Sequence, residues 1–356
     1  MRLLRRLMVS PLLLVLGLVH AQGSSMPSQD WPTASPTEQA LDEKAFAGLP
    51  QRIDSDLTDI RSVVVVRRGR IAFEYYRSGQ TPESLQSVES VTKSVLSMLV
   101  GIAQAQGRIP DLDRPIVELM PELAGVNSDP RARTVTVRHL LTMTAGFQSS
   151  ERRFFDPKEL APYAMSRKFA ANPGEVFRYD NPGANLLAAV IGKAVAEEAG
   201  VFAQRHLFAP LGIDRAEWES DMLGHSLGYR GLKLRTRDLA KLGQLMLQHG
   251  VWRGRQLIPE TYVAAATDLQ NRGASSAGLA YGYLWWVPPS NAPRTTFIAS
   301  GFGGQILFVH TPLDLVVAVT SEVSEASTAR NQAFDLARKG IYQAVLKSQA
   351  EPSTPP

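Results

Sequence analysis

The pattern of hydrophobic and polar residues differs between the two ends of the chain and its middle. Two β-rich runs near the start, residues 62–66 and 71–76, are separated by the basic segment Arg67-Arg68-Gly69-Arg70. Such runs around a short glycine-containing turn predict an antiparallel hairpin with a solvated turn. Further β-rich runs follow near the end of the chain, at residues 281–287, 295–299, 305–310 and 315–320. Because a lone hairpin is not stable in water, we expect strands from both ends of the chain to meet in one sheet.

Helical periodicity dominates between these strands. Val91, Val95, Met98, Leu99 and Ile102 recur at the spacing of one helix face, and Gly107 stands where such a helix would end. Other helices are expected at residues 41–49, 135–144, 185–198, 201–208, 237–248 and 330–346. The pattern therefore predicts an α+β protein. An antiparallel sheet flanked by helices (residues 41–108 and 225–347) carries an inserted all-helical domain (residues 109–224), and residues 348–356 form a tail.

The first 21 residues are typical of a cleavable secretory signal peptide. Three arginines, Arg2, Arg5 and Arg6, precede an apolar run at residues 7–19, and Val19-His20-Ala21 is an acceptable cleavage site. Residues 22–40, rich in Ser, Pro, Gln and Thr, predict a flexible leader. We therefore expect an exported protein, periplasmic or secreted. The chain contains no Cys, so this protein must be stable without disulfides.

Composition and charge narrow the function classes. With 44% hydrophobic and 20% charged residues, the chain has an ordinary globular composition. Its formal net charge of +4 falls to +1 when the three arginines of the signal peptide are removed. The densest basic cluster is the predicted hairpin turn at residues 67–70. A nucleic-acid partner is therefore not expected.

Candidate chemistry begins at the first turn of the apolar helix, where Ser90 and Lys93 are three positions apart and lie on one helix face. The positive end of the helix dipole favours negative charge near the serine oxygen. A partly desolvated lysine has a lowered pKa and can accept the hydroxyl proton. The pair therefore has the form of a nucleophile beside its base, although a helix start with an incidental lysine would give the same four-residue pattern.

A second candidate group is Tyr179-Asp180-Asn181, the only Tyr-x-Asn in the chain, in a segment rich in Pro and Gly. Loops held on a rigid scaffold often carry catalytic groups. A phenol near a lysine ammonium loses its proton more readily and can act as a general base. Asn181 is expected to bind a substrate amide or to hold Lys93 in place. The alternative is an Asp-Asn-Pro turn with a packed tyrosine.

Together, the Ser-x-x-Lys and Tyr-x-Asn motifs resemble those of the β-lactamase-related and penicillin-binding serine hydrolases. This group includes class C β-lactamases, D-alanyl-D-alanine peptidases, related esterases and 6-aminohexanoate-dimer hydrolases. The segments at residues 137–146, 209–213, 237–240 and 281–283 are also similar to segments of that family, in the same order. The resemblance implies a β-lactamase/transpeptidase-like fold. It also implies that Ser90 is the acylated nucleophile, with Lys93 and Tyr179 as its proton-transfer partners.

The third motif of that family departs from its pattern. Where Lys-Thr-Gly or His-Ser-Gly is expected, the best candidate is Ala299-Ser300-Gly301, followed by Phe302. Glycine there lets a substrate lie along the strand, and the Phe302 N–H is a candidate to join that of Ser90 in an oxyanion hole. The cation that would receive a β-lactam carboxylate is missing. We therefore expect an ester or simple amide to be the better substrate.

A competing motif is Gly224-His225-Ser226-Leu227-Gly228, which matches the Gly-x-Ser-x-Gly elbow of α/β-hydrolases, with His310 downstream. That elbow needs a strand before it and a helix immediately after it, and the flanking residues 217–221 and 229–234 indicate neither. An esterase using Ser226 stays as an alternative, as does a catalytically silent relative that binds peptidoglycan or a partner protein.

The remaining expectations concern bound groups. The histidines outside the signal peptide show no paired ligand spacing, so we expect no metal, and the proposed chemistry needs no cofactor. The expected partner is a small ester, amide or short peptide substrate. Trp285 and Trp286 alternate on a predicted strand, which predicts that one lies in the core and the other lines the cleft.

Overall fold

The computed structural model describes residues 31–149, 160–273, 278–289 and 295–350, and one compact unit begins at Trp31. The predicted signal peptide at residues 1–21 lies outside the described residues, as do residues 22–30 of the predicted leader and residues 351–356 of the predicted tail. The rest of the predicted leader, residues 31–40, belongs to the compact unit, where Thr33 forms a bridge with Ile71. Within the described ranges, no helix has both the length and the apolar character needed to cross a membrane.

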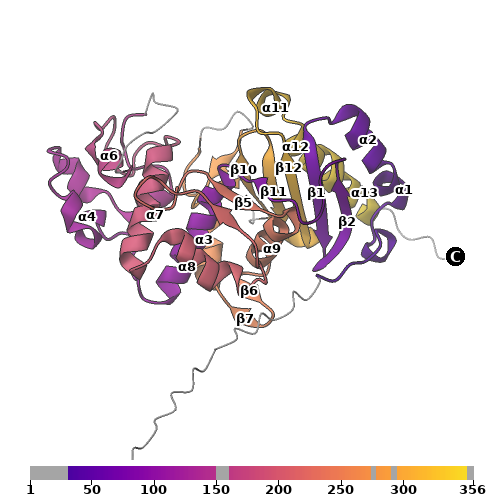
Figure 1. Ribbon diagram of the computed structural model, residues 1–356, viewed down its shortest axis with the longest axis horizontal. Helices are drawn as coiled ribbons and strands as arrows, with labels where there is room; N and C mark the ends of the chain where they lie inside the picture. The colour runs from indigo at the N-terminus through magenta and orange to yellow at the C-terminus, as the bar shows by residue number, and fades with distance from the viewer. Residues whose placement is uncertain (1–30, 150–159, 274–277, 290–294, 351–356) are drawn as a thin grey trace, which may run out of the picture. The chain divides into compact units, whose positions relative to one another are not determined.

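The main sheet is antiparallel and combines strands from both ends of the chain (Figure 1). Its order is β2-β1-β12-β11-β10-β9-β8, which confirms the α+β class and the expected meeting of the two ends. The strands are β1 (Ile60–Arg67), β2 (Arg70–Tyr76), β8 (Ala280–Tyr281), β9 (Trp286–Val287), β10 (Thr296–Gly301), β11 (Gln305–His310) and β12 (Leu315–Ser321).

The first hairpin differs from the prediction at Arg67. This residue was expected in a solvated turn, but it ends β1, opposite Arg70 and Leu315, and only 1% of it is exposed. The turn is shorter and consists of Arg68 and Gly69, both with positive φ (48° and 73°). Because Arg67 pairs with a strand on each side, it belongs to the sheet and not to the turn.

The helices are α1 (Glu43–Ala47), α2 (Leu49–Asp56), α3 (Val91–Ala105), α4 (Ile116–Leu119), α5 (Val137–Leu141), α6 (Leu160–Ser166), α7 (Asn181–Val195), α8 (Ala199–Ala203), α9 (Thr236–Leu247), α10 (Glu260–Ala266), α11 (Glu325–Arg330), α12 (Gln332–Asp335) and α13 (Tyr342–Ala350). Helices α4, α5 and α6 pack on α7, and α3 contacts both α7 and α8. The strand pair β4 (Glu217–Trp218) and β5 (Leu232–Leu234) follows them in the chain. The proposed boundaries of a separate helical domain stay a prediction.

Two predicted elements are interrupted. The single strand expected at residues 281–287 is instead the pair β8 and β9, which hydrogen-bond to each other around a turn where Leu284 has φ +60°. The single helix expected at residues 330–346 is broken at Asn331, whose φ of +54° is left-handed and ends α11 before α12 begins. Local hydrophobic periodicity continues through both breaks, so it did not reveal them.

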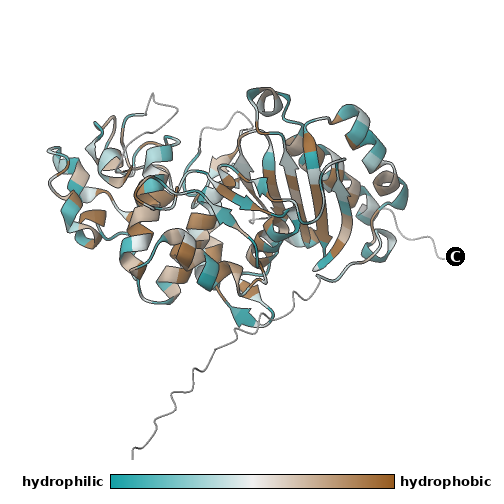
Figure 2. Ribbon diagram, viewed as in Figure 1, coloured by the Kyte–Doolittle hydropathy of each residue, from teal (hydrophilic) through white to brown (hydrophobic). Residues whose placement is uncertain are grey.

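Two hydrophobic cores cover the two faces of the sheet, as strand alternation requires. Val64 and Val66 of β1 join a core shared with α3 and α9, and Val63 and Val65 join a core shared with α1, α2 and the C-terminal helices. Figure 2 shows hydrophobic residues concentrated in the central strands. Helix α3 contacts β10 and β11 and also packs on α7, so its first turn lies between the sheet and the helical segment.

Candidate active site

The predicted nucleophile, Ser90, is the N-cap residue of α3, and its side chain is half-buried. Its hydroxyl does not cap the helix. Instead, Lys93 Nζ donates a hydrogen bond to Ser90 Oγ at 2.8 Å. The preceding residue, Glu89, has φ +48°, a left-handed conformation that is costly for a residue with a side chain. The chain therefore turns sharply into the helix at Ser90, and the serine and lysine meet as the spacing predicted.

Lys93 is one of the largest fully buried side chains among the described residues. Burial lowers the pKa of its ammonium group, because water no longer solvates the charge, and the nearby Tyr179, Glu89 and Asp180 partly oppose this shift. Its Nζ lies 4.8 Å from the centre of the Tyr179 ring. The structure thus brings together three of the predicted residues, Ser90, Lys93 and Tyr179.

A further contact of Lys93 is the backbone carbonyl of Tyr229, which accepts a hydrogen bond from Nζ at 2.8 Å. The same carbonyl is 3.5 Å from Ser90 Oγ. The sequence analysis did not identify this residue, because a backbone oxygen leaves no signal in residue type. The strand β3 (Gln86–Ser87), just before Ser90, pairs with β5, just after Tyr229, and this pairing brings the carbonyl to the site.

The segment before Tyr229 packs closely against α7. The N–H of Gly228 donates to Asn185 Oδ1 at 2.8 Å. A Cβ atom at Gly228 would lie only 2.1 Å from the carbonyl oxygen of Ala184, so glycine is required by space. Asn185 and Gly228 therefore fix the backbone that presents the Tyr229 carbonyl to Lys93.

Tyr179 and Asn181 lie where the loop enters α7, whose first residue is Asn181. Tyr179 is 40% exposed, and its ring stacks on Trp286 with centroids 6.0 Å apart and planes inclined by 7°. Trp285 is fully buried, which confirms that one of the two tryptophans lies in the core, and the cleft role of Trp286 stays a prediction. The Oδ1 atom of Asn181 is buried and has no hydrogen-bond partner among the described residues.

The end of β10 lies beside the residues that precede Ser90. A Cβ atom at Gly301 would be 2.5 Å from the Val88 carbonyl oxygen, so the strand approaches this backbone closely. Ala299 and Gly301 occupy the strand face toward α3, and Ala299 is buried in the α3 core. Alternation places Ser300 on the other face of the strand. Phe302, the first residue after β10, is 41% exposed. The proposed roles of Ser300, Gly301 and Phe302 stay predictions.

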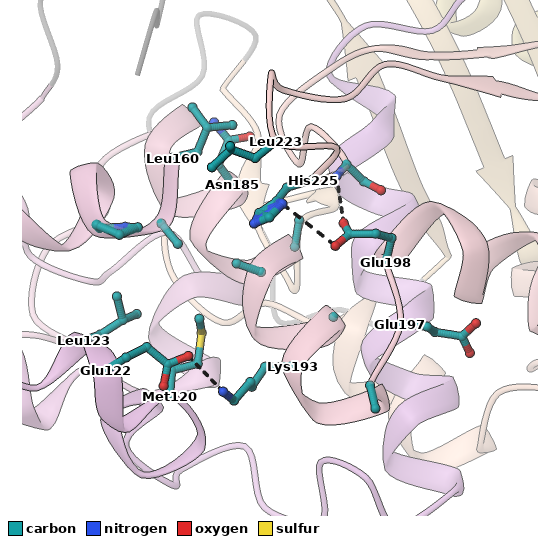
Figure 3. Close-up of a pocket in the computed structure, with 17 residues that line it drawn as sticks. Met120, Glu122, Leu123, Leu160, Asn185, Lys193, Glu197, Glu198, Leu223 and His225 are labelled. Carbon is teal, nitrogen blue, oxygen red and sulfur yellow. Dashed lines mark hydrogen bonds and ion pairs between the residues drawn. The ribbon is translucent and has the colours of Figure 1, made fainter. Parts of the chain in front are cut away.

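The competing serine, Ser226, lies beside a cavity of about 630 Å³ between α7 and the loop at residues 221–226 (Figure 3). Its hydroxyl accepts the N–H of Gly200 at 3.0 Å, and its own N–H donates to Glu198. His225 faces Glu198 at 3.9 Å. The short strand β4 does precede the motif, contrary to the expectation, but the element that follows is strand β5, not a helix, so the elbow geometry is absent. His310 lies on β11 and contacts Tyr342 instead.

Neither Ser90, Lys93 nor Tyr179 lines this cavity, so the two serines belong to separate places in the fold. Within the described ranges, no group of three or more His, Cys, Asp or Glu side chains is arranged to hold a metal ion.

Comparison with curated proteins and solved structures adds independent information. A curated relative, the 6-aminohexanoate-dimer hydrolase of Paenarthrobacter ureafaciens, is 26% identical over 83% of this chain and 81% of its own length. Two solved structures share the fold. A putative 6-aminohexanoate-dimer hydrolase from Bacillus anthracis has a TM-score of 0.70 at 20% identity, covering 87% of each chain. A putative β-lactamase from Bacteroides dorei has a TM-score of 0.72 at 18% identity, covering 86% of this chain and 99% of that one.

These likenesses agree with the predicted fold, an antiparallel sheet with helices of the β-lactamase/transpeptidase type. The Beta-lactamase family model matches residues 54–340, which include both predicted motifs and the whole main sheet. This chain therefore belongs to the β-lactamase family.

Proposed function

We propose that this protein is a serine hydrolase that cleaves an ester or amide bond through an acyl-enzyme on Ser90. One observation carries the proposal: a buried lysine, with a lowered pKa, donates a 2.8 Å hydrogen bond to the hydroxyl of a serine at a helix start. A lysine in its neutral form can accept the serine proton, which turns the hydroxyl into a nucleophile. The name of the Paenarthrobacter relative supports a small substrate.

The proposed reaction begins when Lys93 takes the Ser90 proton and Oγ bonds to the substrate carbonyl carbon. The resulting oxyanion is stabilised by the backbone N–H groups of Ser90 and Phe302. Collapse of this intermediate expels the alcohol or amine, which takes a proton delivered through Lys93 and Tyr179. Water then attacks the acyl carbonyl and loses a proton to the same pair. The bond to Ser90 Oγ breaks, the pair returns the proton to Oγ, and the acid is released.

Two features of the site support roles for its other members. The Tyr179 ring lies beside Lys93 Nζ and is partly exposed, so a proton relay from the lysine to a leaving group can run through its phenol. The unpartnered Oδ1 of Asn181 is an acceptor, so we assign it to an N–H of an amide substrate. The proposed steps use neither a metal nor a cofactor.

The proposal is tested with a fluorophosphonate probe, which reacts with activated serines. Wild type and Ser226→Ala should be labelled at the same rate, and Ser90→Ala should not be labelled. Labelling that survives in Ser90→Ala and disappears in Ser226→Ala would transfer the nucleophile to the other serine. A folded wild type that no probe labels would favour the catalytically silent, binding alternative.

We also propose that the protein is exported, on the basis of the signal-like residues 1–21. Expression in a Gram-negative host followed by N-terminal sequencing of the periplasmic fraction should show a start at Gln22 or within a few residues of it. An intact Met1 in the membrane fraction would make this segment an anchor instead.

A further inference from the structure

A buried ion pair lies directly behind the Tyr179-Asp180-Asn181 segment. The Arg167 guanidinium donates two hydrogen bonds to Asp180, from Nη1 to Oδ1 and from Nη2 to Oδ2, each 2.7 Å long. The two side chains are only 8% and 13% exposed. A bidentate pair of this kind fixes both distance and orientation, and burial protects it from screening by salt.

The carboxylate of Asp180 is committed to this pair. Asp180 occupies the N-cap position of α7, where an aspartate ordinarily accepts N–H groups of the first turn, yet its side chain makes no capping bond. A Cβ atom at Gly183 would lie 2.5 Å from Asp180 Oδ2, so the turn of the helix closes against the carboxylate. The Asp180 N–H donates to the sulfur of Met143. The Asp180 side chain therefore binds Arg167 and does not cap the helix.

Arg167 is itself held from three sides. Its Nε donates to the Ala164 carbonyl at 3.0 Å, and Nη1 donates to the Gln148 carbonyl at 3.2 Å. Its guanidinium also lies over the Phe147 ring, 4.7 Å from the centroid. With these partners Arg167 is held rigidly. It in turn holds Asp180, the residue between Tyr179 and Asn181.

We propose that Arg167 is a positioning residue for the hydrolytic site, which holds Tyr179 and Asn181 in place through Asp180 and neutralises the Asp180 carboxylate beside Lys93. The inference rests on the proposed function, because it assigns Lys93 the role of base. Arg167 itself contacts neither Ser90 nor Lys93 by any hydrogen bond among the described residues.

The electrostatic half of the proposal follows from the groups around Lys93. These groups are Glu89, just before α3, and Tyr179 and Asp180, just before α7. Tyr229 faces Lys93 with its carbonyl and its ring, and the Arg230 guanidinium lies over that ring, 5.4 Å from its centre. Asp180 raises the pKa of Lys93 against the larger lowering caused by burial. Without Arg167, the carboxylate would act on Lys93 uncompensated. The pKa of Lys93 would then rise, and less of the lysine would be neutral at a given pH.

The matched control is Arg131, which mirrors Arg167 in the same region. Arg131 binds Asp129 with two hydrogen bonds and lies 5.0 Å from the centre of the Phe169 ring. Phe169 packs on Phe147, 4.5 Å away, so the two arginines flank one aromatic pair. Asp129, however, does not adjoin a predicted site residue.

The experiment compares Arg167→Met, Asp180→Asn and Arg131→Met, with kcat/KM for p-nitrophenyl butyrate measured from pH 5 to pH 10. For Arg167→Met we expect kcat to fall at least tenfold at pH 7 with little change in KM. Its acid limb should move to higher pH, because activity needs neutral Lys93. Asp180→Asn should move the acid limb to lower pH. Arg131→Met should leave the midpoint of the acid limb unchanged and the rate within twofold of wild type.

A purely structural role would lower the rate in Arg167→Met and Asp180→Asn but leave the midpoint unchanged or shift it in the same direction in both variants. Either result would overturn the proposal, as would an Arg131→Met profile equal to that of Arg167→Met. If Arg167→Met does not fold, as judged by circular dichroism, Arg167→Lys replaces it. That variant keeps the charge but loses the bidentate geometry, so it should lose rate without moving the midpoint.

A second measurement separates failure of this inference from failure of the proposed function. The ionisation of Lys93 can be followed by NMR in protein labelled with 13C at the lysine ε-carbon, with Lys93→Arg used to assign the signal. This titration needs no turnover. If the pKa of Lys93 shifts in opposite directions in Arg167→Met and Asp180→Asn, the inference is supported even in an enzyme that does not act on the ester. An unchanged pKa of Lys93 in both variants refutes it.

Discussion

Ser90 and Ser226 are two serines with very different surroundings, although each belongs to a short motif of a known hydrolase class. Ser90 has a buried lysine 2.8 Å from its oxygen and a backbone carbonyl behind that lysine. Ser226 has a histidine next to it in sequence, but its oxygen is occupied by the N–H of Gly200. His225 instead faces Glu198 at the edge of an open cavity (Figure 3).

The difference shows that the groups around the reactive atom of a motif decide whether that atom can react. The Ser90 hydroxyl is next to a group able to remove its proton, and that group is desolvated, which lowers its pKa. The Ser226 hydroxyl acts as an acceptor that anchors the loop to α8. The same residue type is therefore proposed to act in chemistry at one place, while at the other it makes a structural hydrogen bond.

The largest expected effect tests the base. Lys93→Ala and Tyr179→Phe should each lower kcat/KM by about a hundredfold or more, the range typical of lost general-base catalysis. Because the two residues are proposed to share one proton path, the double variant should be little worse than the worse single variant. His225→Ala, the corresponding change at the other serine, should stay within about twofold of wild type. Multiplicative losses at Lys93 and Tyr179 would show that they act independently.

A somewhat smaller effect is expected from residues 228–229, which follow Ser226 in the chain and reach Lys93. Gly228→Ala places a Cβ atom 2.1 Å from the Ala184 carbonyl, so the backbone of residues 228–229 must move. Such overpacking costs about 1–3 kcal/mol of unfolding free energy. The Tyr229 carbonyl would move with it, and we expect kcat to fall about tenfold. Gly125→Ala, where nothing lies within 4 Å, is the control for thermal unfolding and activity. Equal behaviour of both variants would exclude a role for this backbone.

Substrate preference should show a moderate effect. An unpaired carboxylate that enters a partly desolvated site loses solvation energy unless a cation receives it. We therefore expect a higher kcat/KM for p-nitrophenyl butyrate than for a chromogenic cephalosporin. The position of the missing family cation, Ala299, is buried, so a lysine there would disturb the core. Phe302→Lys, at an exposed position, should narrow the gap between the two substrates by about tenfold, since charge-assisted hydrogen bonds are about twice as strong as neutral ones. Wild-type preference for the cephalosporin would point to a different cation.

The smallest effect is expected at Ser226. Ser226→Ala removes the acceptor of the Gly200 N–H, and a hydrogen bond of this kind contributes about 1 kcal/mol to stability. Thermal unfolding should therefore shift down by a few degrees, while kcat/KM for the ester stays within about twofold of wild type. If activity falls by more than the lost stability explains, Ser226 becomes a candidate nucleophile again.

The sequence by itself determined the parts of this protein that depend on short-range geometry. The helix after Ser90 and the 2.8 Å contact with Lys93 follow from hydrophobic periodicity and from a spacing of three residues on one helix face. The strands of the main sheet likewise followed from β-rich runs, and their meeting from the instability of a lone hairpin. Departures occurred where a left-handed residue, such as Leu284 or Asn331, interrupts a continuing hydrophobic pattern.

Only the tertiary structure decided which distant groups reach the serine and the lysine. The Tyr229 carbonyl arrives through the pairing of β3 with β5, and a backbone oxygen is the same in every residue type, so no sequence pattern marks it. The Arg167–Asp180 pair was equally invisible, because Asp180 is the variable position of the Tyr-x-Asn motif and Arg167 belongs to no motif. The pairing of Arg67 with Leu315 brings in a strand from the other end of the chain. In each case the deciding contact joins residues that do not belong to one local element, and local propensity carries no information about such pairings.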